Sequence, residues 1–287
     1  MILLRWQVDP VLIGGIMTLL TCYTLAVGPL RPYLAPSAPF PYQQAGLFYL
    51  AMLLLYVVEG SPLHDLAELY LFSAHMLQHV LLSYLVAPLL LLGLPAWLLR
   101  PILLQPRIKP IARFLLHPLV AFLTFSVLFS LWHLPIVYEG ALRNSLVHHS
   151  EHVLLLLISL MLWWPLFSPL PELPRLSYAG QLIYLFVLPI VQMPVFAAVT
   201  FADTVIYPSY AAAPRLFIDD PLGDQALGGA IMKVAGLLVF GSLFIFKFFR
   251  WYQQEQQANS GNDASPAAKV TAPTAAPQPS VETGQSP

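Results

Sequence analysis

The sequence predicts an all-α, polytopic membrane protein with seven transmembrane helices. Hydrophobic residues make up 58% of the chain, charged residues only 9%, and the mean hydropathy is +0.71. An ordinary soluble domain has about a quarter of its residues charged. Apolar runs of about 20 residues, long enough to cross a hydrocarbon core as helix, recur along the chain. These observations together place most of the chain in a bilayer.

Seven apolar runs are expected to span the membrane, at approximately 11–30, 44–59, 69–92, 117–134, 146–168, 180–203 and 227–249. The runs are continuous, whereas the strands of a membrane barrel alternate over about ten residues. Every backbone polar group must be satisfied within a span, which favours helices. The first run lacks a small-residue cleavage site and further spans follow it, so we expect it to be retained.

The composition divides the chain into a membrane domain, 1–250, and a tail, 251–287. The tail consists largely of Ala, Pro, Gln, Ser, Thr and Asn. Such a segment cannot bury enough apolar surface to offset its conformational entropy. We therefore expect a disordered tail on the cytoplasmic side.

The distribution of lysine and arginine predicts the orientation, because short cytoplasmic loops are enriched in these residues. With seven spans, the side that contains the C-terminus receives Arg31, Arg100, Arg107, Lys109, Arg113, Arg175, Lys247, Arg250 and Lys269. The other side receives only Arg5, Arg143 and Arg215. The N-terminus is therefore expected outside, and the loops 60–68, 135–145 and 204–226 face outward. The net charge of −1 gives no indication of a nucleic-acid partner.

Two predicted helix starts on the outer side each carry a His-x-x-x-His pair, His75 with His79 and His148 with His152. Residues i and i+4 lie on the same helix face, about 6 Å apart along the axis, so each pair is able to bind one metal ion. Ionisable residues inside a membrane are costly and usually functional. The sequence therefore predicts a metal site near the outer face.

Further candidate ligands lie on the same side. His133 ends the fourth run and joins the two pairs as a predicted ligand, and His149 and His64 are further candidate partners. Imidazole suits zinc, copper, iron and nickel, and a thioether shifts the choice toward copper(I). Met76 and Met232 would supply such sulfur if they point inward.

Several features limit the chemistry. The single cysteine, Cys22, excludes an internal disulfide framework and any paired-thiol metal motif. The i,i+4 spacing fits a small ion better than haem, although haem between two axial histidines stays open. The string HHSEH at 148–152 also matches the zinc-protease pattern H-x-x-E-H, but nothing else strengthens that interpretation. Glu151 is instead expected to orient a ligand histidine by accepting a hydrogen bond from its non-ligating ring nitrogen, or to interact favourably with the dipole at a helix N-terminus.

The segment DQALGGAIMK at 224–233 precedes and opens the last span. Its glycines permit close helix approach. Lys233 is expected to extend outward or to pair with an acid such as Asp224.

At these residues the chain resembles the CtaG family of integral-membrane cytochrome c oxidase assembly factors. The matching pieces are HMLQHVLLSYLVAPLLLLGLP at 75–95, WHLP at 132–135, HHSEH at 148–152 leading to WWP at 163–165, and DQALGGAIMK at 224–233. They run through most of the membrane domain in the expected order. Position 233 departs from the family pattern, because it is a lysine where an aromatic residue is expected.

The resemblance implies a non-enzymatic role in maturing a haem-copper oxidase in a bacterial plasma membrane. The expected cargo is copper, and the expected partners are oxidase subunits and periplasmic copper donors. Three alternatives stay open: a metal transporter, disfavoured because the spans turn apolar below the histidines, a haem-binding electron-transfer protein, and a scaffold whose histidines only hydrogen-bond between helices.

Overall fold

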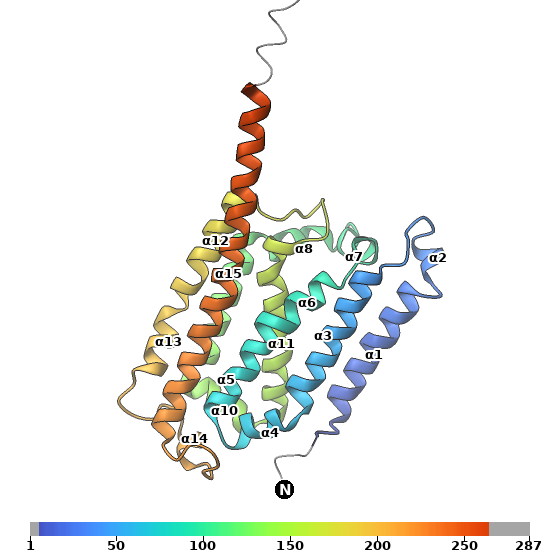
Figure 1. The fold of residues 1–287 in the computed structure, drawn as a ribbon. Coiled ribbons are helices and arrows are strands. Elements are labelled where there is room, and N and C mark those ends of the chain that lie inside the picture. Colours follow the sequence, from blue (N-terminus) through green and yellow to red (C-terminus); the bar gives the residue numbers. More distant parts are fainter. Residues whose placement is uncertain (1–5, 264–287) are drawn as a thin grey trace, which may run out of the picture.

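The computed structural model describes residues 6–263, and within this range every regular element is a helix (Figure 1). Six helices are long and apolar enough to cross a membrane. A bent pair of shorter helices raises the number to seven if it forms one span. The predicted all-α membrane fold is therefore confirmed in its class, with six to seven candidate spans.

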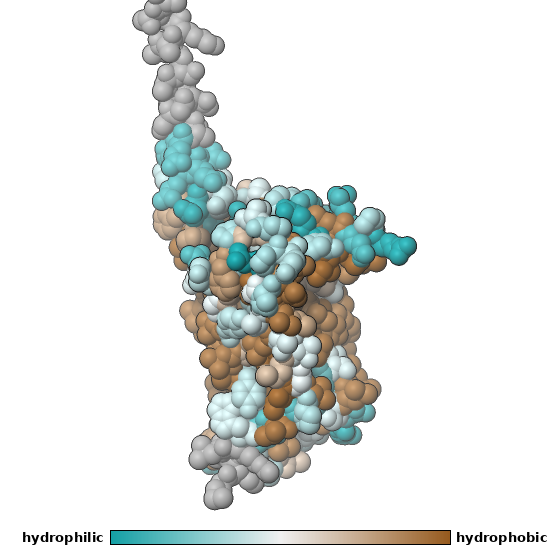
Figure 2. Space-filling view, turned by 90° about the vertical axis from the view of Figure 1, so that its right-hand side faces the viewer, coloured by the Kyte–Doolittle hydropathy of each residue, from teal (hydrophilic) through white to brown (hydrophobic). Residues whose placement is uncertain are grey.

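The candidate spans follow the predicted runs closely. They are α1 (Pro10–Val27), α3 (Tyr42–Gly60), the continuous segment Phe72–Leu92, α11 (Ser145–Phe167), the segment Tyr178–Thr200 and α15 (Pro221–Asp263). On the face of the molecule drawn in Figure 2, hydrophobic residues form a band across the middle, and hydrophilic residues gather toward the ends. This pattern is expected of a helical bundle surrounded by lipid.

The fourth predicted span, 117–134, differs most from expectation. It forms α9 (Pro118–Trp132), which passes as a span only together with α8 (Lys109–Leu115), at a bend of 63°. The bend falls at His117, directly before Pro118. A residue before proline is disfavoured in the helical region, and His117 is extended with ψ of 132°.

The third span contains a wide turn in its middle. Helix α5 (Phe72–Leu81) passes through a π-helical turn (Leu82–Val86) into α6 (Ala87–Leu92). Pro88 has no N–H to continue the normal hydrogen-bond ladder at this point. The indole of Trp163 donates a hydrogen bond of 2.7 Å to the Ser83 carbonyl within the wide turn, so α11 is fixed against the middle of the third span.

The short connecting helices lie at the two ends of the bundle (Figure 1). The end that contains the N-terminus also carries α4 (Pro62–Leu69), α10 (Pro135–Arg143) and α14 (Pro208–Ala212). The opposite end carries α2 (Arg31–Leu34), α7 (Ala96–Leu103) and α8. The sixth span consists of α12 (Tyr178–Val191) and α13 (Met193–Thr200).

The last helix runs further than the boundary predicted at residue 250. Helix α15 continues to Asp263, and the Gln and Glu residues at 253–257, directly after the span, are good helix formers. The remaining part of the predicted disordered tail, 264–287, lies outside the described residues.

Helix α15 also fixes the position of α5. The Asp224 carboxylate, 1% exposed, accepts hydrogen bonds from the backbone N–H groups of Phe72 (2.7 Å) and Ser73 (3.2 Å). These are the first N–H groups of α5, which its own sequence leaves uncapped. A Cβ at Gly228 would lie 2.4 Å from the Phe72 ring, so glycine is needed for the close packing.

The pairing considered between Asp224 and Lys233 is therefore wrong. Asp224 caps α5, and the Lys233 ammonium lies 5.9 Å from the centre of the Phe196 ring. The capping arrangement is stronger because buried N–H groups at a helix start require acceptors, and a carboxylate also interacts favourably with the helix dipole.

Candidate metal centre

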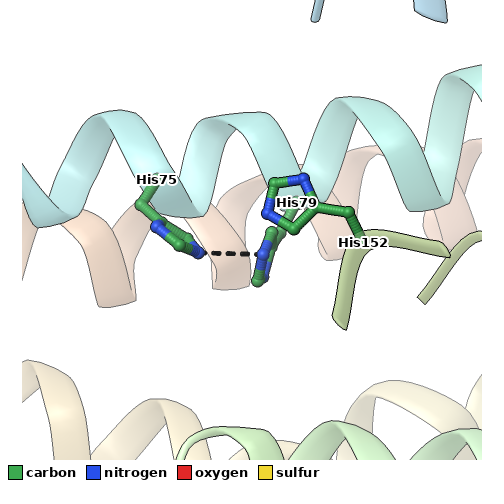
Figure 3. A group of neighbouring side chains, drawn as sticks. All are labelled: His75, His79 and His152. Carbon is green, nitrogen blue, oxygen red and sulfur yellow. Dashed lines mark hydrogen bonds between the residues drawn. The ribbon is translucent and has the colours of Figure 1, made fainter. Parts of the chain in front are cut away.

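Three buried histidines from two helices converge near the N-terminal end of the bundle. His75 and His79 come from α5 and His152 from α11 (Figure 3). They are 1%, 5% and 7% exposed. One nitrogen of each ring lies within 4.8 Å of the other two, and the Nε2 atoms of His75 and His79 are 2.9 Å apart. We call this group the buried triad.

Glu59, near the end of α3, orients His152. The His152 Nδ1–H donates a hydrogen bond of 2.7 Å to Glu59 Oε2. The Nε2 atom has no hydrogen-bond partner among the described residues. A carboxylate behind a histidine fixes the tautomer and raises the basicity of the opposite nitrogen, as it does in many metal sites. His152 Nε2 therefore carries an available lone pair within the triad.

Tyr210, in α14, orients His75. The Tyr210 hydroxyl donates a 2.6 Å hydrogen bond to the Ala67 carbonyl. Its single proton is thereby used, so at 3.2 Å it accepts from His75 Nδ1–H. This leaves the His75 Nε2 lone pair facing His79, whose Nε2–H donates across the 2.9 Å contact.

The triad fits a small ion with three nitrogen ligands. Three nitrogens in a plane, each about 2.0 Å from one ion, lie about 3.5 Å apart. The observed separations run from 2.9 Å to at most 4.8 Å and so bracket this value. Binding would require only small ring movements and transfer of the His79 proton from Nε2. The arrangement can therefore hold a cation with neutral imidazole ligands, and Glu59 balances the charge.

A second group lies next to the triad and nearer the surface. His64 Nε2 is 3.2 Å and His148 Nε2 is 2.7 Å from Glu68 Oε1. Burial raises the pKa of the Glu68 carboxyl, but the contacts with His148 and His64 outweigh it and hold this pKa well below its usual range. Glu68 is therefore an anion at neutral pH. We call these three residues the outer group.

The outer group opens onto a pocket of about 400 Å³. Asp9, His149 and Arg143 lie on the pocket wall with the outer group. The Asp9 carboxylate is 2.8 Å from His149 Nε2, and this hydrogen bond lowers the pKa of Asp9. The pocket is thus polar and leads from the surface to the outer group.

Comparison with known proteins identifies the family. A model of the family described as cytochrome c oxidase caa3 assembly factor, Caa3_CtaG, matches residues 21–254. The chain belongs to the Caa3_CtaG family. The match contains all residues of the buried triad and the outer group.

Two curated relatives are uncharacterised proteins of Mycobacterium bovis and Mycobacterium tuberculosis. Each is 24% identical to this Caa3_CtaG chain over 209 residues, which are 67% of the chain and 32% of the relative. The aligned part thus spans about a third of the length of these relatives. No solved structure matches the chain.

The structure of this Caa3_CtaG protein divides the predicted ligands. It brings together His75, His79 and His152, and separately His64 and His148. The expectation that each i,i+4 pair grips one ion therefore fits only His75 with His79. His148 and His152 have ring centres 4.4 Å apart, but their nitrogens are directed to different carboxylates, Glu68 and Glu59.

Two other predicted histidines lie outside both groups. His133 donates from Nδ1 to the Phe129 carbonyl (2.7 Å) within its own helix end. His149 is occupied by Asp9 and by the Ser145 carbonyl. His133 Nε2 is buried without a hydrogen-bond partner, but neither histidine belongs to a three-ligand group in the described part of the chain.

Met76, Met232 and Glu151 are buried, and none of them belongs to either three-residue group. Met76 is fully buried and faces α15, where its Cγ would lie 3.2 Å from a Cβ at Gly228. Met232 is buried in the hydrophobic core. Glu151, 1% exposed, lies 3.8 Å from His79 Nε2 and 3.8 Å from His148 Nδ1. It sits between the two groups as a buried carboxylate.

Three residues that contact the candidate ligands were not predicted for this Caa3_CtaG chain, namely Glu59, Glu68 and Tyr210. Glu59 had a detectable signal, because it is the one acid in an otherwise apolar span. Glu68 lies four residues after His64, so the same spacing rule that selected the histidine pairs applies to it. Tyr210 carried no local signal, since its role depends on how the loop before α15 folds back over α5.

Proposed function

We propose that this protein is an assembly factor for a haem-copper cytochrome c oxidase, and that it holds copper at the buried triad for delivery to the oxidase. The observation that carries the proposal is the pairing of His152 with Glu59, which leaves an unbonded Nε2 directed toward His75 and His79. The proposed role is one of binding and transfer, without catalysis.

The donor set favours copper. Imidazole nitrogens suit copper well, and copper(I) accepts three-coordinate sites without added water. The sole cysteine, Cys22, is exposed on α1, so no thiolate joins the three nitrogens. A buried monovalent cation also requires a nearby anion, because an unpaired charge in a low-dielectric interior is costly. Glu59 supplies that anion.

The dimensions of the triad argue against haem as its ligand. Two axial histidines must lie on opposite sides of a planar macrocycle. The ring centres of His75 and His79 are 4.3 Å apart, and those of His79 and His152 are 5.1 Å apart. The rings contact one another, which leaves no space for a porphyrin between them.

The proposed location is a bacterial plasma membrane with the triad near the outer face. The lysine and arginine distribution supports this orientation, since the N-terminal end of the bundle carries few of these residues. The triad residues come from α5 and from the beginning of α11, which directly follow the connecting helices α4 and α10 of that same end (Figure 1). Copper would then come from periplasmic donors, and the recipient would be an oxidase subunit in the same membrane.

The test is copper content and the absorption spectrum of detergent-purified protein, measured in parallel on the H75A/H79A variant. The exposed His117, outside both groups, gives the matched control H117A. We expect about one copper ion per chain in the parent and in H117A, and loss of that ion in H75A/H79A. A parent that stays metal-free when copper is offered refutes copper handling and favours a scaffold. A haem absorption band would favour the electron-transfer alternative.

A further inference from the structure

We propose that the outer group, His64, Glu68 and His148, is a loading site that receives copper from the pocket and passes it to the buried triad. This inference rests on the proposed function, because it assumes that the triad holds copper. Beyond the proposed function, it gives copper an ordered route through two sites that differ in exposure and in their ligands.

The outer group begins at the surface and ends at a side chain as buried as those of the triad. The Glu68 side chain is 31% exposed, that of His64 is 16% exposed and that of His148 is 4% exposed. All three lie on the wall of the 400 Å³ pocket, whereas no triad residue does. A copper donor that approaches from outside therefore meets the outer group first.

The two groups are adjacent, so an ion can pass between them by exchange of ligands. His148 and His152 lie one turn apart on α11, with ring centres 4.4 Å apart. The ring of His148 is also 5.6 Å from that of His75. The Gln78 side-chain nitrogen lies 3.0 Å from both Glu59 Oε2 and His64 Nδ1, which links the supporting contacts of the two groups.

The ligand sets give the route a direction. The outer group offers two imidazoles and a carboxylate, and carboxylate ligands suit hard cations better than copper(I). The triad offers three imidazoles in a drier environment. Copper(I) should therefore bind more weakly at the outer group and move inward. Neither ring nitrogen of the buried His148 makes a hydrogen bond within the described residues, although Nε2 lies 2.7 Å from Glu68 Oε1. Buried polar atoms are normally satisfied, so this also points to a ligand role.

Two other arrangements make different predictions. If the two groups formed a single binding unit, removal of an outer ligand would lower the amount of copper held at equilibrium. If the outer group were only an ion-pair network, its removal would leave both the amount and the rate of copper uptake unchanged. A loading site affects the rate but leaves the final amount unchanged.

The experiment measures copper(I) transfer from a coloured chelator complex to detergent-purified protein by stopped-flow absorbance, and then the copper content after equilibration. The variants are E68Q and H64N in the outer group and H75A/H79A in the triad. The control is D65N, because Asp65 lies in the same helix, α4, but contacts Gln7 rather than either group. Monodisperse elution of each variant provides the check on folding.

We expect E68Q and H64N to take up copper roughly tenfold or more slowly than the parent, with the same final content. D65N should match the parent, and H75A/H79A should lose the tightly held ion. Parent-like rates in both E68Q and H64N would overturn the loading site while leaving the triad intact. A final copper content reduced as far as in H75A/H79A would overturn it in favour of a single unit. A parent that binds no copper would refute the proposed function as well.

Discussion

Glu59 offers the sharpest test of how the triad is prepared for an ion. In the E59Q variant, the carboxylate behind His152 becomes a neutral amide of nearly the same shape. The hydrogen bond from His152 Nδ1 is 2.7 Å long, buried and charge-assisted, so it is among the stronger contacts in the site. The amide oxygen can still accept the bond, but it no longer balances the charge of the bound ion.

Loss of such a supporting partner typically lowers metal affinity by about 10- to 100-fold, or about 1.4 to 2.7 kcal/mol. The assay is competition for copper(I) against a chelator of known affinity, using the parent, E59Q and H152A. We expect the affinity to fall in that order, because H152A removes the ligand itself. The control is E139Q, since Glu139 is also buried but bonds to Ser209. An affinity of E59Q equal to that of the parent would refute the assigned role of Glu59.

Three further predictions concern the surroundings of the site. The G228V variant should lose about 1–3 kcal/mol of stability and melt at a lower temperature in detergent, because the added atoms would overlap the Phe72 ring. Unchanged melting would contradict the packing argument. The Y210F variant should bind copper more weakly than the parent, by up to about tenfold, because His75 Nδ1 loses its acceptor. Equal binding would show that this hydrogen bond does not set the tautomer of His75. The pKa of Asp9 is lowered in the folded state, so its stabilising contribution is present above its ordinary pKa and is lost as the pH falls through the folded value. Acid unfolding of D9N should therefore begin at a higher pH than that of the parent. Identical acid-unfolding profiles would contradict this.

Much of the fold could be predicted because the bilayer imposes simple rules on the sequence. The long apolar runs became helices at nearly the expected positions. The bend at His117 and Pro118 could also have been predicted from the proline rule. The cap that Asp224 provides for α5 could not, because it joins residues more than 150 positions apart.

The metal site stays a prediction, and the structure tests only how its candidate residues are grouped. Helical spacing places His75 beside His79, since both lie on one face of one helix. The same spacing suggested that His148 and His152 act together, yet the pair is divided between Glu68 on α4 and Glu59 on α3. Which carboxylate each ring meets depends on how three helices pack, and no local pattern in the sequence contains that information.

Unbonded polar atoms at the two groups give a final reason to regard the cluster as a binding site rather than an interhelical contact. Some buried atoms without hydrogen-bond partners are scattered through the described bundle, for example at Ser126 and Gln192, but Glu59 Oε1, His148 Nδ1, Glu151 Oε1 and His152 Nε2 lie together at the two groups. Each such atom costs about 1–3 kcal/mol when buried. Histidines that served only to join helices would be selected to satisfy both ring nitrogens. A cation at the triad would take up the His152 Nε2 lone pair and compensate the buried charge of Glu59. Relief of the cost of these unbonded groups on metal binding would then contribute directly to the copper affinity of the triad. The outer group, which binds copper more weakly, would release the ion to the triad instead of holding it near the surface.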